Sequence, residues 1–503
     1  MTTTLDIQQI ISLLKSPSKE DVELIKKAAA FAETKHAGQK RKSGEPYYNH
    51  VFATAKNIAE LHMSATTVSA GLLHDVMEDC GVTREELEKE FGKEILFLVE
   101  GVTKLGKIKY IGTERYNESL RKLFVAMSQD IRVLIIKLCD RLHNIQTLEH
   151  VRKEKQLRIA TETLEIYAPI ANRLGIKKLQ RDLEDNAFPY VYPKESEDVR
   201  KIMRLKKVEV EEHLKNFEKS LKKELAKNGV TKFVMDHRVK GLYSLFKKLQ
   251  KYKGDTEAIY DISALRITVE SISDCYKILG IIHGAWRPLP GRIKDYIASP
   301  KLNGYRSIHT TIFTGDGGIV EVQVRTEEMH QEAEFGIASH ISYKEGVKTK
   351  SLNPNLAWLK NILPGMSKES YEVSNDDALK DVPSWIKELV EYQKDAGEEF
   401  VDEVKTDFFE ERIFVFTPKG DVIDLPKDSS IIDFAYAIHT DVGNKMSGAK
   451  VNGKFVSLDT TLENGDRVEI ETKKNAKPSK KWLEYCKTTM AKRRVNNFLE
   501  KNK

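Results

Sequence analysis

The chain has 503 residues, of which 40% are hydrophobic and 31% are charged, and its formal net charge is +6. This length and apolar content predict about three or four domains of ordinary size with substantial cores. No apolar run approaches membrane-spanning length and the N-terminus lacks a signal-peptide pattern, so we expect a cytoplasmic protein with no membrane partner. The four cysteines form no Cys-x-x-Cys pair, which argues against a structural zinc site and for reduced thiols.

Histidine and acidic residues cluster in the N-terminal third. Residues 71–79 are Gly-Leu-Leu-His-Asp-Val-Met-Glu-Asp. On a continuous helix, His74 would stack over Glu78 and Asp75 over Asp79. An imidazole beside a carboxylate is a typical ligand pair for a divalent metal, although a solvated helix face is the alternative.

Two residues elsewhere in this third extend the cluster. His50 precedes an apolar-periodic helix, and Asp140 stands in a buried-looking run that starts at Val133. A carboxylate at the end of such a run usually needs a partner or a metal. With His74 and Asp75 they would form a mixed nitrogen and oxygen site, which suits Mn(II), Fe(II) or Zn(II) better than Ca(II).

The middle third changes from a charged helical stretch, 196–227, to strand-like segments. Residues 319–325 alternate strictly, which places Glu321, Gln323 and Arg325 on one face of a strand. Asp261 precedes another strand, and two carboxylates on neighbouring strands could hold Mg(II) between nucleotide phosphates. Basic residues that would neutralise phosphate charge stand nearby, with a solvated basic surface as the alternative: Arg238, Lys240, Lys247, Lys248, Arg292, Lys294 and Lys301.

The C-terminal part predicts a small β-rich module after a connector. Residues 412–425 predict two strands around a Pro-Lys-Gly-Asp turn, and Asn452-Gly453 is a hairpin signal. A helix is expected at 431–439. From Lys473 to the end there are eleven Lys or Arg against two acidic residues. This tail suits nucleic acid electrostatically, and a solvated fragment of a helical domain is equally compatible.

The ordered series His50, His74-Asp75 and Asp140 is the pattern of the HD phosphohydrolase superfamily. Longer sequence words resemble the Rel/SpoT family of bifunctional (p)ppGpp synthetase/hydrolases over about residues 20–490. These words are Arg41-Lys-Ser-Gly-Glu-Pro46, His74-Asp-Val-Met-Glu-Asp79, Lys137-Leu-Cys-Asp-Arg-Leu-His-Asn144, Asp236-His-Arg-Val-Lys-Gly-Leu-Tyr-Ser244, Pro290-Gly-Arg-Ile-Lys-Asp-Tyr-Ile297 and Glu321-Val-Gln-Val-Arg-Thr326.

The resemblance implies a multidomain chain with three folds. These are an all-α HD-type hydrolase domain over 1–195, an α/β nucleotidyltransferase-like synthetase domain over 196–345 and a small β-grasp TGS domain over 409–472. A helical linker would cover 346–408, and 473–503 would start a basic helical region. Longer relatives continue into zinc-binding and ACT regions, so we expect either a naturally short form or a piece of a longer chain.

By the same resemblance, the enzyme would transfer pyrophosphate from ATP to the 3′-hydroxyl of GDP or GTP and would also hydrolyse (p)ppGpp. Mn(II) would serve the hydrolase site and Mg(II) the synthetase site. Two alternatives stay open: a hydrolase-dominant form with weak or no synthetase activity, and a tRNA- or ribosome-binding regulator with vestigial catalysis. The two activities oppose each other, so we expect exclusive states coupled through the segment from Leu179 to Arg204.

The resemblance also assigns residues in the hydrolase domain. The Mn(II) ligands would be His50, His74, Asp75 and Asp140, with Glu78 and Asp79 acting on the attacking water. The nucleotide would be positioned by Arg41, Lys42, Asn144 and Thr147.

In the synthetase domain, Asp261 and Glu321 would be catalytic and bind Mg(II). ATP would contact Arg238, Lys240, Ser244, Lys248 and Arg266. GDP or GTP would contact Arg292, Lys294, Asp295, Lys301, Asn303, Tyr305, His309 and Gln323.

His439 of the TGS domain matches a residue that contacts tRNA in the family, and an ordinary helix-end histidine is the alternative. Four positions depart from the family pattern: Asn172, His237, Gly241 and Ile341. Of these, His237 is the one expected to influence ATP affinity, because it precedes Arg238.

Overall fold

The computed structural model describes residues 5–106, 130–256, 262–301, 304–339 and 412–501. Contacts within these ranges divide the chain into two compact units, one ending at residue 339 and one covering residues 412–501. Among the described helices, none is both long enough and apolar enough to cross a lipid bilayer. The expected linker and the predicted residues Asp261, Asn303 and Ile341 lie outside the described residues.

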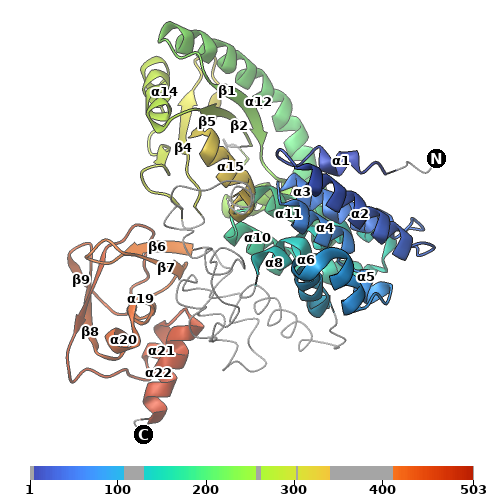
Figure 1. Cartoon of the computed structure of the whole chain (residues 1–503). Coiled ribbons are helices and arrows are strands. Elements are labelled where there is room, and N and C mark those ends of the chain that lie inside the picture. The colour runs from blue at the N-terminus through green and yellow to red at the C-terminus, as the bar shows by residue number, and fades with distance from the viewer. Residues whose placement is uncertain (1–4, 107–129, 257–261, 302–303, 340–411, 502–503) are drawn as a thin grey trace. The chain divides into compact units, whose positions relative to one another are not determined.

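In its described residues, the N-terminal region of the first unit contains helices and no strand, as expected for an HD-type fold (Figure 1). Helices α3, α4 and α8 pack against one another, and α2 and α6 contact α4. The helices are α1 Gln8–Ile11, α2 Lys19–Lys35, α3 Tyr48–Glu60, α4 Ala65–Leu73, α5 Val76–Asp79, α6 Arg84–Gly106, α8 Ile131–Gln146, α9 Lys153–Glu162, α10 Ala168–Arg173 and α11 Lys177–Val191, with short helical segments η1 Leu148–His150 and η2 Thr163–Tyr167.

Side-chain caps fix where several of these helices begin. Ser18 and Asp21 form a reciprocal capping box at the start of α2, and Ser64 accepts from the backbone N–H of Thr67 in α4. Asp130 caps α8, where its carboxylate also holds the buried guanidinium of Arg132 at 2.8 Å. The start of α8 is therefore anchored before the chain reaches Asp140.

The expected continuous helix over 71–79 is wrong, because it is interrupted between α4 and α5. His74 ends α4 and Asp75 precedes α5. The His74 ring donates from Nδ1 to the Gly71 carbonyl at 2.8 Å, and it therefore competes for the acceptor that an unbroken helix would give to the Asp75 N–H. His74 is buried while Glu78 is exposed, so these two side chains do not share one wall.

A five-stranded sheet with the order β1-β2-β5-β4-β3 forms the second part of the first unit. The parallel pair β2 and β5 lies at its centre, and the other neighbouring strands are antiparallel. The bounds are β1 Val234–Val239, β2 Ser263–Val269, β3 Lys294–Asp295, β4 Ile308–Phe313 and β5 Ile319–Thr326. This mixed sheet confirms the α/β architecture expected for the synthetase domain.

Helices cover the sheet and join it to the helical region. Buried residues of α12 (Pro193–Lys227) and α14 (Ile272–Ala285) form one core with the apolar face of the sheet, which includes Val320, Val322 and Val324. α13 (Leu242–Lys251) packs against α11 and α12, and α15 (Glu327–Phe335) contacts β2, β5 and α11. Thus α11 contacts both parts of this unit.

The second unit is a small β module with a helical tail. Its strands are β6 Arg412–Phe416, β7 Val422–Pro426, β8 Met446–Val451, β9 Lys454–Val456 and β10 Val468–Thr472, and its helices are α19 Ile431–Ile438, α20 Thr440–Asn444, α21 Trp482–Tyr485 and α22 Thr489–Lys501. Asn452 and Gly453 both have positive φ, as the predicted hairpin requires. Buried residues of α21 and α22 belong to the same core as β6–β10 and α19.

Candidate active sites

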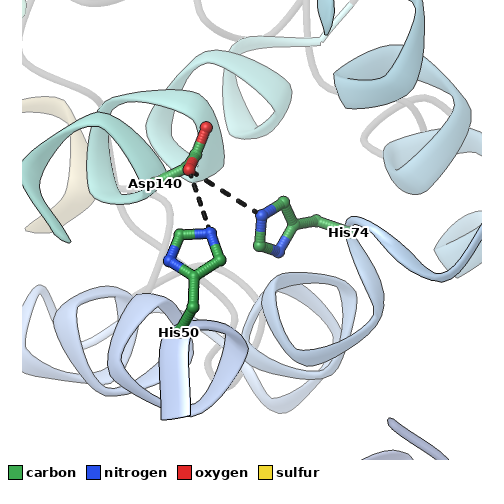
Figure 2. A group of neighbouring side chains, drawn as sticks. All are labelled: His50, His74 and Asp140. Atoms are coloured by element: carbon green, nitrogen blue, oxygen red, sulfur yellow. Dashed lines mark ion pairs between the residues drawn. The ribbon is translucent and has the colours of Figure 1, made fainter. Parts of the chain in front are cut away.

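Three side chains from different parts of the helical region converge on one point (Figure 2). His50 lies in the first turn of α3, His74 follows α4, and Asp140 belongs to α8. Their ligand atoms all lie within 4.8 Å of one another, and all three residues are buried. His50 Nε2 is 3.2 Å from Asp140 Oδ1, and His74 Nε2 is 3.9 Å from it.

Asp75 brings a second carboxylate to this cluster. Its Oδ2 lies 3.1 Å from His74 Nε2 and 3.6 Å from His50 Nε2. Burial opposes ionisation, but the charges and hydrogen bonds of His74 and His50 hold the pKa of Asp75 well below its usual range. The four residues predicted as metal ligands therefore lie together, and we call them the HD cluster.

The donors of the HD cluster fit a divalent cation. His74 Nδ1 bonds the Gly71 carbonyl, so the buried Nε2 is the atom that faces the carboxylates of Asp75 and Asp140, at 3.1 and 3.9 Å. A buried imidazole whose other nitrogen is held by a carbonyl is the usual state of a metal-ligating histidine. Burial opposes a positive charge here, but Asp75 and Asp140 raise the pKa of His74 to about 9, which shows how strongly this point attracts cations.

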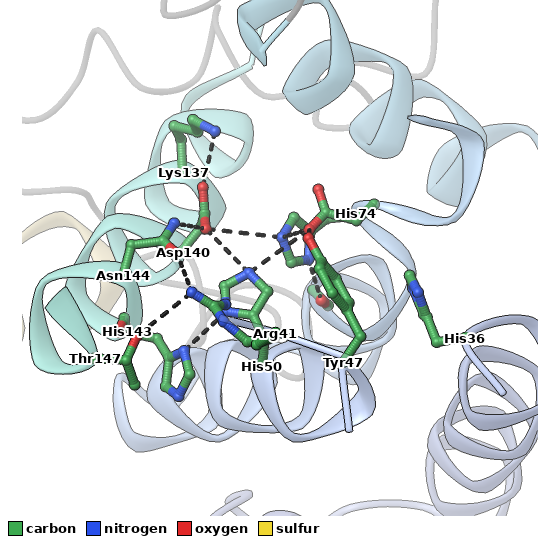
Figure 3. Close-up of polar contacts among 12 residues, drawn as sticks. His36, Arg41, Tyr47, His50, His74, Lys137, Asp140, His143, Asn144 and Thr147 are labelled. Carbon is green, nitrogen blue, oxygen red and sulfur yellow. Dashed lines mark hydrogen bonds and ion pairs between the residues drawn. The ribbon is translucent and has the colours of Figure 1, made fainter. Parts of the chain in front are cut away.

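Neighbouring side chains orient the members of the HD cluster (Figure 3). The Tyr47 hydroxyl donates to Asp75 Oδ2 at 2.8 Å, and Lys137 Nζ donates to Asp140 Oδ2 at 2.8 Å. His143 Nδ1 lies 2.8 Å from His50 Nδ1. Burial, together with His50 and Arg41, lowers the pKa of His143 to about 3, so its ring is neutral.

Tyr47, Lys137 and His143 have no role predicted from the sequence. A signal was present for two of them, because Lys137 and His143 stand three residues before and after Asp140 on one helix. Positions three apart lie on the same helix face. Tyr47 stands three residues before His50, but no local pattern connects it with Asp75.

A cavity of about 500 Å³ opens beside the HD cluster. All four residues predicted to position the nucleotide line it: Arg41, Lys42, Asn144 and Thr147. One guanidinium nitrogen of Arg41 donates to Asn144 Oδ1 at 2.8 Å and to Thr147 Oγ1 at 3.4 Å. Glu78 and Asp79, the predicted acid–base pair, also line the cavity.

A row of polar side chains crosses the second face of the sheet. Gln323 links two of them, since its Nε2 donates to Glu321 Oε1 at 2.8 Å and its Oε1 accepts from Arg238 at 3.1 Å. Glu321 Oε1 is 3.1 Å from His309 Nδ1, and His309 Nε2 is 2.8 Å from the Tyr305 hydroxyl. The predicted strand periodicity is confirmed, because the three valines of β5 face the core instead.

Three other residues predicted for the synthetase site contact aromatic rings or carboxylates. Lys301 lies 4.5 Å from the Tyr296 ring centre and 5.4 Å from that of Tyr305. Arg266 is buried and lies 3.4 Å from Glu334 and 3.6 Å from Asp236. Ser244 Oγ donates to Glu184 of α11 at 3.4 Å.

Further residues predicted near the nucleotides differ in exposure and partners. Asp295 accepts from the Tyr276 hydroxyl and from the backbone N–H groups of Ile297 and Ala298, which makes it a turn-forming residue. Lys294 in β3 and Arg292 just before it are exposed, whereas Lys240 and Lys248 are partly buried.

Three departures from the family pattern have structural explanations. His237 is exposed and its Nε2 lies 2.8 Å from Glu218, so its side chain is engaged away from the Arg238–Gln323 pair. A Cβ at Gly241 would lie 3.1 Å from the Asp185 carboxylate, which accepts from the Tyr243 N–H. Asn172 accepts a hydrogen bond from Lys177.

In the second unit, His439 is exposed between α19 and α20. Its Nδ1 accepts from the backbone N–H of Asp441 at 3.2 Å and so caps the start of α20. This local bond accounts for the orientation of the ring. Contact with tRNA stays a prediction.

Three family descriptions match the chain: HD domain over residues 28–177, region found in RelA / SpoT proteins over 237–348, and TGS domain over 413–472. A guanosine-3′,5′-bis(diphosphate) 3′-pyrophosphohydrolase of Aquifex aeolicus is 43% identical over 498 residues, which cover 98% of this chain and 67% of that protein. The chain belongs to the Rel/SpoT family. A second Rel/SpoT relative, a GTP pyrophosphokinase of Myxococcus xanthus, is 43% identical over 486 residues, which cover 95% of this chain and 61% of that protein.

This chain thus spans about three fifths to two thirds of the length of these Rel/SpoT relatives. Among solved structures, small alarmone synthetase 2 of Bacillus subtilis is 28% identical over a match that covers 30% of this chain and 84% of the synthetase. The TM-score of 0.23 is too low to support a comparison of folds.

Proposed function

We propose that this Rel/SpoT chain is a bifunctional alarmone enzyme. It transfers pyrophosphate from ATP to the 3′-hydroxyl of GDP or GTP, and it hydrolyses (p)ppGpp to GDP or GTP and pyrophosphate. The observation that carries the proposal is the HD cluster, which opens onto a cavity lined by Lys40, Arg41 and Lys42. Buried metal donors beside a basic cavity suit a phosphorylated substrate.

In the hydrolase site, the HD cluster would hold Mn(II), the ion that the family resemblance implies. Two imidazoles with carboxylates suit Mn(II), Fe(II) or Zn(II) better than Ca(II). When bound, the cation would offset the charge of the 3′-diphosphate and lower the pKa of a water molecule. Glu78 and Asp79 lie on the cavity wall, where one carboxylate orients the attacking water and accepts its proton.

The remaining cavity residues bind and orient the nucleotide. Arg41 and Lys42 offer positive charge to the phosphates, and the guanidinium fork of Arg41 suits phosphate geometry. Asn144 and Thr147 hold that guanidinium in place through their oxygens. The positive charge of Arg41 is therefore already in position before the substrate binds. Such preorganised charge is the main contribution expected of the protein in phosphoryl-type reactions.

In the synthetase site, Glu321 and Asp261 would hold Mg(II), which would offset the charge of the ATP phosphates when bound. Glu321 also accepts the proton of the attacking 3′-hydroxyl. Its carboxylate is oriented by Gln323 and lies beside His309. Arg238, which is bonded to Gln323, offers a guanidinium to the ATP phosphates.

The second unit would contribute nucleic-acid contacts. The TGS match, the exposed His439 and the basic residues after Lys473 support uncharged tRNA and the ribosome as partners. ATP, GTP and ribosomes are cytoplasmic, so the proposed work of the chain lies in the cytoplasm.

Paired assays of the unaltered chain test this function. Incubation with ATP, GDP or GTP and Mg(II) should yield (p)ppGpp, and incubation of (p)ppGpp with Mn(II) should release pyrophosphate. Product is followed by anion-exchange chromatography, with each metal omitted in turn. Absence of (p)ppGpp formation would leave a hydrolase-dominant enzyme, and absence of release with any divalent cation would contradict the hydrolase assignment.

A further inference from the structure

One lysine of the hydrolase domain lies next to the synthetase domain. Lys177 is the first residue of α11, and α11 packs against α13 and α15. Just before it, the Leu174 carbonyl accepts from the Ile337 N–H at 3.0 Å. Two turns further along α11, Glu184 lies 2.9 Å from Lys247 of α13. These contacts hold the start of α11 against the synthetase side.

The ammonium of Lys177 has neutral hydrogen-bond partners but charged neighbours. It donates to Asn172 Oδ1 and, at 3.0 Å, to Gln180 Oε1. Burial lowers the pKa of Lys177, and the positive charges of Lys301, Arg238 and Lys247 contribute in the same direction, while Glu184 opposes them, so that the pKa is about 8. Gln180 in turn donates to Glu184 at 3.1 Å, and Glu184 accepts from Ser244 Oγ at 3.4 Å, so hydrogen bonds connect Lys177 with a residue predicted to contact ATP.

Positive charge exceeds negative charge around Lys177. Among the described residues, the charged groups that act on Lys177 or Lys301, counted with these two lysines, are five cations (Lys177, Arg238, Lys247, Lys294 and Lys301) and two carboxylates (Glu184 and Glu321), which leaves a surplus of three positive charges. Burial, followed by the charges of Lys294 and Arg238, also lowers the pKa of Lys301, while Glu321 opposes them. Crowding like charges in a partly buried place is unfavourable unless an anion joins them.

We propose that Lys177 binds the phosphate groups of a nucleotide in the synthetase site, so that the hydrolase domain supplies one residue of that site. The inference rests on the proposed synthetase function. A triphosphate or diphosphate brings more than one negative charge, which matches the surplus of cations. Such phosphates belong either to ATP or to the guanine nucleotide, and separate titrations distinguish the two.

The test compares Lys177→Met, Lys177→Gln and Lys177→Arg in the full chain with Lys178→Met as a matched control. Lys178 is the next residue of the same helix, and its Nζ lies 2.6 Å from Glu60, within the hydrolase domain. Equilibrium titrations use a non-hydrolysable ATP analogue and, separately, GDP. Initial rates of synthesis give KM and kcat, and (p)ppGpp hydrolysis reports the integrity of the other site.

Lys177→Met and Lys177→Gln should weaken binding of one of the two nucleotides about tenfold and raise its KM by a similar factor, the loss expected for one charged hydrogen bond. The rate of (p)ppGpp hydrolysis should be unchanged in these two variants. The nucleotide affinity of Lys177→Arg should stay within about twofold of that of the unaltered chain, and the affinity of Lys178→Met should equal it. Binding of both nucleotides unchanged in Lys177→Met would overturn the inference. Loss of hydrolysis in all three Lys177 variants would also overturn it, because the role would then be structural.

The same measurements distinguish a wrong synthetase assignment from a wrong Lys177 contact. If the unaltered chain makes no (p)ppGpp while Lys177→Met still weakens nucleotide binding, the synthetase assignment is wrong and the phosphate contact stands. If the unaltered chain makes (p)ppGpp and Lys177→Met binds both nucleotides normally, the contact is wrong and the synthetase assignment stands.

Discussion

The ring of His143 determines which ring nitrogen of His50 can bind a cation. The two Nδ1 atoms are 2.8 Å apart, so one of them must carry the proton. His50 can offer Nε2 to a cation only when its own Nδ1 is protonated and donates. A neutral His143 accepts that bond, and it therefore keeps His50 in the state that binds metal.

Replacing His143 with alanine should weaken Mn(II) binding about tenfold to a hundredfold, which is the usual loss when the partner of a metal-ligating histidine is removed. The hydrolysis rate at low Mn(II) should fall with it and recover partly at high Mn(II). Titration followed by electron paramagnetic resonance of free Mn(II) measures the affinity. Unchanged Mn(II) affinity would show that His143 does not support His50, and unchanged synthesis provides the control.

At the residue scale, the sequence indicated which residues gather in the HD cluster better than it indicated the side chains that orient them. His50, His74, Asp75 and Asp140 could be chosen because few other roles suit those residue types in such surroundings. The Tyr47 bond to Asp75 could not be foreseen, since it joins residues 28 positions apart through folding alone. The hydrogen bonds of Asp295 to the backbone of Ile297 and Ala298 could not be foreseen either, and its place near the nucleotide stays a prediction.

At the element scale, the junction between α15 and the turn before α11 is unusually tight. Gly336 ends α15 with φ +51°, a value that side chains rarely adopt. A Cβ there would lie 2.3 Å from the Leu174 carbonyl oxygen and 2.4 Å from the carbonyl carbon of Gly175. Only glycine allows this approach, which joins the synthetase helix to the last helices of the hydrolase domain.

Replacing Gly336 with alanine should destabilise the first unit by about 1–3 kcal/mol, because backbone must move to admit the methyl group. Urea unfolding followed by circular dichroism measures the loss. Gly280→Ala is the matched control, since Gly280 lies inside α14 and nothing is within 4 Å of the added Cβ. That change should be neutral or slightly stabilising. Equal stability of both variants would show that α15 does not need this close contact.

Periodicity predicted the elements well where burial is one-sided. The alternation of 319–325 and the hairpin signal at Asn452-Gly453 both fit the observed strands. The break between α4 and α5 was missed because it comes from the bond of the His74 ring to the Gly71 carbonyl. Spacing carries no sign of such a competing bond.

At the scale of the whole molecule, α11 is the element through which the two proposed sites could influence each other. It contacts α8, which carries Asp140, and it contacts α13 and α15 of the synthetase domain. The expected coupling through the segment from Leu179 to Arg204 stays a prediction, and so do the domain boundaries. The sequence indicated candidate residues for each site, but the packing of α11 against α15 depends on long-range contacts that no local pattern encodes.

The basic tail illustrates the same limit in the second unit. Its charge left two alternatives open, a nucleic-acid contact and a solvated fragment of a helical domain, and in the structure its apolar residues pack into the core of the β module. The buried carboxylate of Asp433 accepts from the backbone N–H groups of Lys487 and Thr488 and so fastens the tail to α19. Composition showed the charge of the tail, and only folding shows which face it buries.

The central claim, two opposed active sites in one chain, is tested most directly by measuring synthesis and hydrolysis side by side in two variants. Asp75→Ala should lower (p)ppGpp hydrolysis by more than about a hundredfold and leave synthesis intact, because it removes a carboxylate of the HD cluster. Glu321→Ala should abolish synthesis and leave hydrolysis intact. Loss of both activities in either variant, or retention of both, would contradict the account.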